Sequence, residues 1–241
     1  AVRVNCYRSV LARQRLHMIG LPPVQPEEYI EKVVLGDAYG SVNFYLLPFV
    51  KPSMVKLITG TDEKGNNLSY DETLRRMLAR EEINMAERNV LVSHQFYLPA
   101  GKEAEEVERM DSEIRTVGNI DEVSAEILHL FDYAALGHIH KPQAMGREMV
   151  RYAGSILKYS FSEIHKDKQA TILTISKNKQ ISLSHHLLKP LRDMREMECS
   201  LESLLKRKCE IGNEEDYMHV ILTDDCLLYT SPSPRDGLLS R

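Results

Sequence analysis

The amino-acid sequence predicts an α/β fold whose neighbouring strands run in parallel. Two short, continuous apolar runs, at residues 89–93 and 132–136, are typical of strands that are buried on both faces. A segment with helical spacing of its apolar residues, 121–130, lies between them. Strands that alternate with helices in this order usually lie in one sheet and point in the same direction.

The first fifty residues predict a helix followed by two strands. Residues 1–14 have a helical pattern, and three apolar side chains share one of its faces: Val4, Val10 and Leu11. Short β-rich runs at residues 16–19 and 42–47 are typical of strands. Because the helical pattern starts at once, without an initiating methionine or a leader, we expect the chain to begin within a domain.

A longer helix is expected from residue 69 to about residue 87. Ser69 and Glu72 have the spacing of a capping box, in which the serine oxygen accepts a hydrogen bond at the start of the helix. One apolar stripe follows the cap: Leu74, Met77, Leu78 and Ile83. The acidic stretch at residues 102–113 is expected to be solvated surface or a mobile loop, because runs of charge are usually exposed.

The last third of the chain predicts a hairpin and then a second, smaller unit. Residues 170–176 and 180–184 alternate in polarity and are joined by a short polar turn, which is typical of a β-hairpin that closes a domain. Beyond about residue 190, a helical segment at 194–207 and a strand at 217–222 indicate a second α/β unit.

Composition excludes several classes of protein. The 241 residues, with 43% hydrophobic and 27% charged side chains, suit one large globular domain and a small appendage. The net charge of -4 provides no overall basic field for nucleic acid, although a local patch or a partner protein can supply phosphate contacts. The four cysteines lack a C-x-x-C pair, and no apolar run reaches the roughly 18 residues of a membrane span. We therefore expect a soluble, cytoplasmic protein that does not contact a membrane.

The end of the chain, residues 226–241, differs in character from the rest. Its Ser- and Pro-rich composition is typical of a disordered terminus. The run CLLYTSPSPRD, however, resembles the conceptual translation of a sequencing-library adapter, so we expect this tail to be non-native. Resequencing the genomic locus tests this expectation, and a natural coding sequence that continues through Cys226 with the same tail would contradict it.

Three histidines directly follow the two predicted buried strands. His94 comes after the first strand, and His138 and His140 follow the second in the sequence Gly137-His-Ile-His. Side chains at positions i and i+2 of an extended chain point the same way, and sites in α/β sheets gather at the carboxyl ends of strands. A lone histidine is more often structural than a ligand. The cluster of three nevertheless favours a metal site.

Three stretches resemble a known family: VLVSHQF, GNIDEVSAEILHLFDYAALGHIHKPQ and RYAGSILKYSFSE. They are similar to the calcineurin-like metallophosphoesterases and, within these, to the SbcD branch of nuclease subunits. The Gly-His-x-His motif marks the wider superfamily, whereas KPQ and YAGSILKYSFSE are characteristic of the SbcD branch. The resemblance covers most of residues 1–225.

The resemblance implies a domain organisation. Residues 1–189 would form the C-terminal part of the metallophosphoesterase sandwich, which is the nuclease domain. Residues 190–225 would begin a small α/β capping domain, and residues 226–241 would be the non-native tail.

The resemblance also implies a site with two divalent metal ions, usually manganese, which five motifs hold together. Only the lone histidine and Gly-His-x-His motifs occur here, so His94 and His138 would bind one ion and His140 the other. The remaining Asp, His, bridging Asp and Asn ligands would lie upstream of Ala1. Three residues would form a turn that touches substrate phosphate or, alternatively, only a tight turn: Tyr152, Gly154 and Ser155.

The implied function is that of a metal-dependent DNA exonuclease and endonuclease subunit in DNA end processing, repair, recombination and replication. The implied partners are DNA and an SbcC-type coiled-coil ATPase subunit, with a homodimer of the nuclease inside a heterotetramer. Without the bridging carboxylate two metal ions would repel each other, so we expect little or no nuclease activity from this chain alone. The alternatives are a phosphatase of the same superfamily and a non-catalytic scaffold that binds the ATPase.

Overall fold

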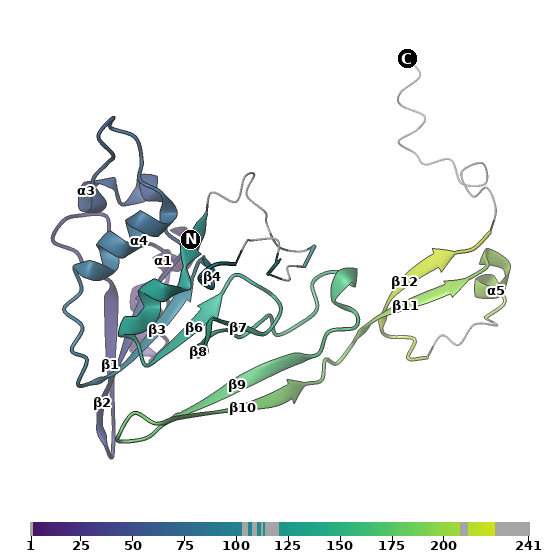
Figure 1. Ribbon diagram of the computed structural model, residues 1–241. Helices are drawn as coiled ribbons and strands as arrows, with labels where there is room; N and C mark the ends of the chain where they lie inside the picture. Colours follow the sequence, from purple (N-terminus) through teal and green to yellow (C-terminus); the bar gives the residue numbers. More distant parts are fainter. Residues whose placement is uncertain are drawn as a thin grey trace. The chain divides into compact units, whose positions relative to one another are not determined.

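The computed structural model describes residues 2–102, 106–107, 110–111, 113, 121–207 and 212–224 (Figure 1). The chain divides into two compact units. The first consists of Ala1–Leu157 and Lys166–Leu188, and the second of Lys158–His165 and Lys189–Arg241. In the part of the chain that the structure describes, no helix is both long enough and apolar enough to cross a membrane.

The first unit is built on a six-stranded sheet with the strand order β1-β2-β3-β6-β8-β7 (Figure 1). Four central strands run in parallel: β2 (Gly40–Leu47), β3 (Arg88–His94), β6 (Tyr133–Gly137) and β8 (Arg147–Tyr152). The edge strands are antiparallel to their neighbours: β1 (Glu31–Asp37) and β7 (Gln143–Met145). The prediction of an α/β fold with parallel neighbouring strands is therefore confirmed.

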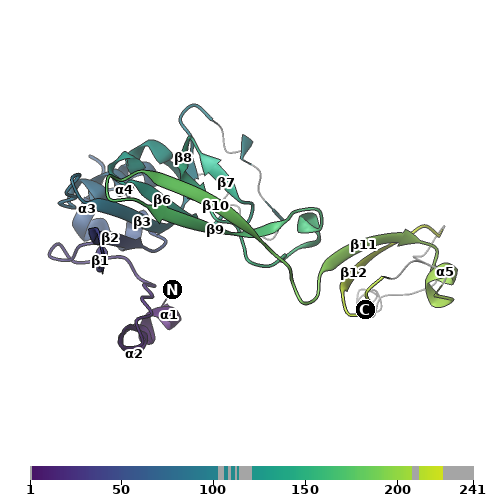
Figure 2. The same ribbon diagram turned by 90° about the horizontal axis from the view of Figure 1, so that it is seen from below.

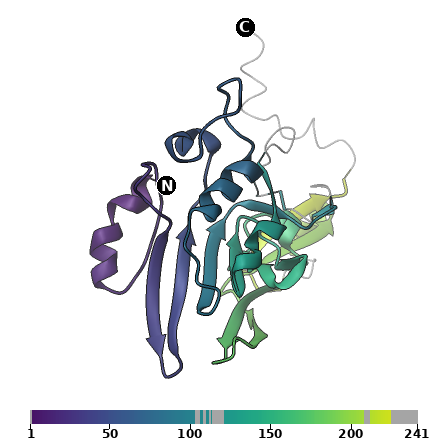
Figure 3. The same ribbon diagram turned by 60° about the vertical axis from the view of Figure 1, so that its left-hand side comes forward.

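The helices of this unit are short. They are α1 (Val2–Cys6), α2 (Arg8–Arg13), α3 (Lys56–Thr59) and α4 (Tyr70–Ala79), with 3-10 turns η1 (Pro52–Met54) and η4 (Ala125–Leu130). Figure 3 shows α1 and α2, in purple, beside the edge of the sheet that β1 forms. The helical pattern predicted for residues 1–14 is confirmed within residues 2–13 as two short helices, but Val10 of the predicted apolar face is exposed.

Helix α4 starts as predicted but ends early. The side chain of Ser69 accepts a hydrogen bond of 3.1 Å from the backbone N–H of Glu72, which satisfies one of the open donors at the start of the helix. The helix ends at Ala79 rather than near residue 87. Beyond it, the side chain of Asn84 accepts a hydrogen bond from the N–H of Ala86, and this local turn competes with further helix.

The main core lies on the face of the sheet that α4 covers. Side chains of the central strands, among them Tyr45, Leu91 and Leu136, are buried there together with Leu74 of the helix. The opposite face is less covered, because Val92 of β3 remains 41% exposed. The prediction that β3 is buried on both faces is wrong at this position.

Three segments of the first unit differ from the predictions. Residues 16–20 are irregular rather than a strand, and the N–H of Leu16 bonds back to the end of α2. Residues 121–130 do not form one helix, because β5 (Glu122–Ser124) pairs in parallel with β4 (Phe96–Leu98) before the turn η4 begins. The acidic stretch at residues 102–113 is not all solvated, since three of its described residues are buried: Val107, Met110 and Glu113.

The predicted hairpin is confirmed and is longer than expected. Strands β9 (Lys168–Ile175) and β10 (Ile181–Leu188) pair in antiparallel fashion, and Figure 2 shows them lying across the sheet. At the turn, the Lys179 ammonium lies 3.2 Å from the carboxylate of Asp132, just before β6. At the other end, the Lys168 ammonium lies 3.2 Å from the carbonyl oxygen of His140, just after β6. The hairpin therefore spans the length of β6.

The second unit contains the parallel strands β11 (Met194–Cys199) and β12 (Tyr217–Leu222), the helix α5 (Leu201–Leu205) and the turn η5 (Phe161–Glu163). The strand predicted at residues 217–222 is confirmed. The helix predicted at residues 194–207 is wrong for its first part, because this segment pairs with β12 instead of forming a helix. The tail at residues 226–241 lies outside the described residues.

Candidate functional site

The carboxyl ends of the four parallel strands lie side by side at one edge of the sheet. The register pairs Leu47 with Ser93, Ser93 with Leu136, and Leu136 with Tyr152. The residues that follow these strands are therefore brought together, as is usual for sites in α/β sheets. His94 is the last residue of β3, His138 directly follows β6, and His140 is the third residue after β6.

The structure brings His94 and His138 into direct contact. Their ring centroids are 5.4 Å apart, and the ring planes are inclined by 86°, so that one ring meets the other edge-on. The His138 ring is also stacked on Phe49, which follows β2, with a centroid distance of 6.3 Å. It lies 6.1 Å from the ring of Phe96, and these aromatic neighbours limit where the imidazole can turn.

The backbone at Gly137 and His138 has little tolerance for change. A Cβ atom at Gly137 would lie only 2.9 Å from Nδ1 of His94. The absence of a side chain at residue 137 therefore allows the His94 ring to lie close to the backbone of β6. His138 has a φ angle of +116°, which is uncommon for a residue with a side chain. Such a conformation costs about 1–3 kcal/mol and is found most often at functional sites.

His140 is held by its backbone on two sides. Its N–H donates a hydrogen bond of 2.7 Å to the buried carboxylate of Glu113. Its carbonyl oxygen accepts bonds from the N–H of Ser155, at 3.1 Å, and from the ammonium of Lys168, at 3.2 Å. The loop after β6 is therefore tied to the turn after β8 and to the start of β9.

Gly154 makes this close approach possible. Its φ angle is +83°, a conformation that favours glycine. A Cβ at this position would lie 2.9 Å from the carbonyl oxygen of His140 and 2.8 Å from the ring of Pro142. The turn after β8 and the histidine loop can therefore pack together only when residue 154 lacks a side chain.

Electrostatics favour the neutral form of the His94 imidazole. Partial burial, followed by the Coulombic effect of the nearby His140, holds the pKa of His94 below its usual value. One side of the His94 residue is open to solvent, while the other faces Gly137 and the His138 ring. A neutral imidazole is the form that binds a metal ion.

The imidazole nitrogens are suitable ligands for a divalent transition metal, but they do not form a complete metal site by themselves. Imidazole nitrogens are common ligands of such ions, usually together with carboxylates. Over the described ranges, however, no group of three or more His, Cys, Asp or Glu side chains is arranged to hold a metal ion. The structure thus places His94 and His138 in contact with His140 close by, but within the described residues these side chains are not arranged as a metal-binding group.

The residues proposed to touch substrate phosphate have other roles in the structure. Tyr152 is completely buried, and its hydroxyl accepts a hydrogen bond from the N–H of Tyr97 and donates one to the carbonyl oxygen of Gln95. It cannot reach a substrate in this conformation. The Ser155 hydroxyl donates to the carbonyl oxygen of Leu157. These contacts favour the alternative of a tight turn.

Sequence reasoning missed three buried polar residues that shape the site. Gln95 is fully buried, and its amide pairs with both the N–H and the carbonyl oxygen of Val50, at 3.1 and 3.0 Å, which joins the ends of β2 and β3. Because Gln95 directly follows a predicted strand, its place in the sequence could have indicated that it lies near the site. Glu113 and Lys168 have no such signal, because they reach His140 across 27 and 28 residues of sequence.

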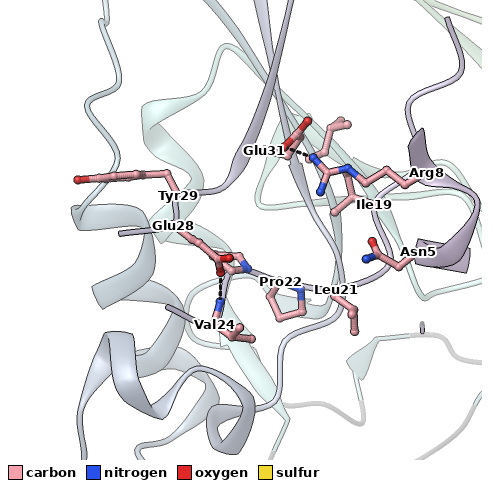
Figure 4. Close-up of a pocket in the computed structure, with 11 residues that line it drawn as sticks. Asn5, Arg8, Ile19, Leu21, Pro22, Val24, Glu28, Tyr29 and Glu31 are labelled. Atoms are coloured by element: carbon pink, nitrogen blue, oxygen red, sulfur yellow. Dashed lines mark hydrogen bonds and ion pairs between the residues drawn. The ribbon is translucent and has the colours of Figure 1, made fainter. Parts of the chain in front are cut away.

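A separate pocket of about 400 Å³ lies at the β1 side of the sheet (Figure 4). It is lined by the first helices, the irregular segment that follows them, and strands β1 and β2. The ion pair between Arg8 and Glu31 crosses it, and the Glu28 carboxylate accepts hydrogen bonds from Val24 and Gln25. None of the three histidines lines this pocket, so it is not part of the histidine site.

The fold is metallophosphoesterase-like: a mixed α/β unit with few helices, whose central sheet is mostly parallel and ends in the histidine cluster. No family model matches the chain. The chain is 29% identical over 184 residues to the SbcD subunit of the nuclease SbcCD from Staphylococcus epidermidis, a match that covers 76% of the chain and 47% of the relative. It is 31% identical over 182 residues to the corresponding SbcD protein of Staphylococcus saprophyticus, which covers 75% of the chain and 46% of the relative. The aligned part of the chain is therefore SbcD-like, and the chain spans about half the length of these curated relatives.

Proposed function

We propose that the chain supplies part of the metal centre of a DNA nuclease. The observation that carries this proposal is the contact between His94 and His138 at the ends of neighbouring parallel strands, with His140 near them. The similarity to two proteins named as nuclease subunits supports the same reaction class, hydrolysis of a phosphodiester.

In this proposal His94 and His138 hold one divalent ion and His140 holds a second, with manganese as the ion used. A pair of such ions, about 3.5–4 Å apart, activates water and stabilises the leaving oxygen in phosphodiester hydrolysis. The protein's own contribution is to hold the imidazoles in a fixed orientation. Phe49 and Phe96 around the His138 ring, and the hydrogen bonds around His140, support that role.

The names of the relatives support a partner subunit, and the remaining features of the assembly are our proposal. Both are SbcD components of the SbcCD nuclease, so we propose that the chain acts on DNA ends together with an SbcC-type ATPase. We further propose a homodimer of the nuclease within a heterotetramer. The second unit, with its parallel strands β11 and β12, would be the beginning of a capping domain.

Binding of Mn²⁺ to the purified chain tests the role of the histidines. We expect His94→Ala or His138→Ala to weaken Mn²⁺ binding at least about tenfold, measured by isothermal titration calorimetry. The matched control is His185→Ala, because His185 is an exposed histidine on β10 whose ring contacts the polar side chains of Gln169 and Thr171 on the neighbouring strand. Equal binding by all three variants would contradict the proposed centre.

Activity assays separate the proposed function from its alternatives. We expect little or no cleavage of linear duplex DNA by the chain alone with Mn²⁺, since the described residues contain no group of three or more His, Cys, Asp or Glu side chains arranged to hold a metal ion. Cleavage of DNA would contradict the prediction of inactivity while supporting a nuclease. Hydrolysis of p-nitrophenyl phosphate without DNA cleavage would favour the phosphatase alternative. Tight binding of the ATPase without any Mn²⁺ binding would favour the scaffold.

A further inference from the structure

Lys168 is a buried lysine at the start of β9. Only 5% of the residue is exposed. Its ammonium donates a hydrogen bond of 2.8 Å to the hydroxyl of Ser155 and one of 3.2 Å to the carbonyl oxygen of His140. Burying an ammonium group is unfavourable unless its donors are satisfied. The location of Lys168 therefore calls for a reason beyond packing.

The three residues form a closed set of contacts. The N–H of Ser155 donates to the same carbonyl oxygen of His140 that Lys168 contacts, while the Ser155 hydroxyl accepts from Lys168. Two segments that are irregular on their own, the loop after β6 and the turn after β8, are thus joined to a regular strand. The Glu113 carboxylate holds the other side of His140 through its N–H.

The histidine loop is the part of the site that needs such support. It includes His138 with its φ of +116°, and a strained conformation persists only where surrounding contacts determine it. Residues 138–142 contain no helix or strand. The imidazole of His140 can therefore be presented in one place only if its backbone is tied from outside.

We propose that Lys168 is a positioning residue, which fixes the backbone of His140 and thereby sets where this imidazole meets the other two histidines. The inference rests on the proposed function in so far as His140 is a metal ligand. Lys168 acts through the carbonyl oxygen of His140 and the hydroxyl of Ser155.

Lys179, at the other end of the same hairpin, provides a matched control. Its ammonium lies 3.2 Å from the Asp132 carboxylate and donates a hydrogen bond to the carbonyl oxygen of Met85. Its side chain is 26% exposed. Lys179→Met removes the same charge from the same hairpin, but at the opposite end of β6 from His140.

The test compares Lys168→Met and Lys179→Met in the full chain by NMR. We expect Lys168→Met to shift the imidazole signals of His140 and to speed exchange of the Ser155 amide hydrogen at least about tenfold, because the loop opens locally. Lys179→Met should leave both observables as in the wild type, even if it lowers the melting temperature equally. Unchanged His140 signals in Lys168→Met, or equal shifts in both variants, would overturn the inference.

Two further measurements complete the design. If Lys168→Met does not fold, Ser155→Ala replaces it, because that change removes a hydrogen-bond acceptor of Lys168. Ser155→Ala should shift the same His140 signals. Unchanged His140 signals in Ser155→Ala would overturn the inference. Mn²⁺ affinity should fall about tenfold in Lys168→Met, the usual effect of losing a residue that orients a ligand. If the wild type itself binds no Mn²⁺, the proposed function fails, while the NMR comparison still decides whether Lys168 positions His140.

Discussion

Replacing Gly137 by alanine should displace the His94 ring while leaving the sheet folded. Gly137 and His94 are opposite each other in β6 and β3, and the new Cβ would lie 2.9 Å from Nδ1 of the ring. Non-bonded heavy atoms prefer a separation of about 3.5 Å or more, so the ring has to move by roughly half an ångström. The ring can turn more easily than the strand can shift, because His94 is open to solvent on one side.

The expected change in the free energy of unfolding is small. Adding a methyl group to a closely packed position costs about 1–3 kcal/mol, and a movable ring places this case at the low end. Alanine in a strand regains about 0.5–1 kcal/mol relative to glycine. The two effects nearly cancel, so Gly137→Ala should change the free energy of unfolding by less than about 1 kcal/mol while the edge-on contact of His94 with His138 is altered.

Urea denaturation measures the stability, and the imidazole signals of His94 and His138 in NMR spectra report the geometry. Gly36→Ala is the control, because Gly36 lies in strand β1 and a Cβ there would meet no atom within 4 Å. Its histidine signals should match those of the wild type. The reasoning would be refuted by a Gly137→Ala protein whose histidine signals also match, or by one that loses several kcal/mol of stability.

Three further predictions can be checked in denaturation experiments. Gly154→Ala should lower the free energy of unfolding by about 2–4 kcal/mol, since its Cβ would strike a backbone oxygen. Gly65 has a similar φ of +80° but open space around it, so Gly65→Ala should lower the free energy of unfolding by only about 1 kcal/mol. Equal losses in the two variants would contradict this reasoning. Tyr152→Phe should cost about 1–3 kcal/mol because two buried backbone groups lose their partner, and a loss below about 0.5 kcal/mol would argue against that role. Hydrogen bonds from Arg88 lower the pKa of Asp37 to about 2, so its stabilisation is complete above its unfolded pKa of about 3.9 and disappears as the pH falls towards 2. The stability difference between wild type and Asp37→Asn should therefore shrink over this range, and a constant difference would disprove the assignment.

Much of the sheet and of the histidine cluster was predictable from local sequence. The runs at residues 89–93 and 132–136 are continuous and apolar, as is typical of buried strands in a parallel sheet. Because His94 and His138 directly follow these strands, the carboxyl-edge rule was enough to predict that they lie together. The cap of α4 at Ser69 was predictable for the same reason, since it depends on two residues only.

Short segments of mixed polarity were predicted less well. Residues 122–124 and 194–199 have spacing that suits a helix, yet each forms a strand that pairs with a partner far away in the sequence. For segments of this length the intrinsic preference is weak, and the hydrogen bonds offered by a neighbouring strand decide the outcome. No local pattern contains that information.

The sequence alone determined the class of fold, the order of the buried strands and the position of three imidazoles at their ends, because these follow from the spacing of neighbouring residues. Only the tertiary structure decided which polar groups hold those imidazoles in place. Glu113 and Lys168 contact His140 across 27 and 28 residues, and Tyr152 turned out to be buried rather than exposed to substrate. The physical reason is that a buried charge or hydroxyl is satisfied by whatever partner the fold brings near, and its own neighbours in sequence do not identify that partner.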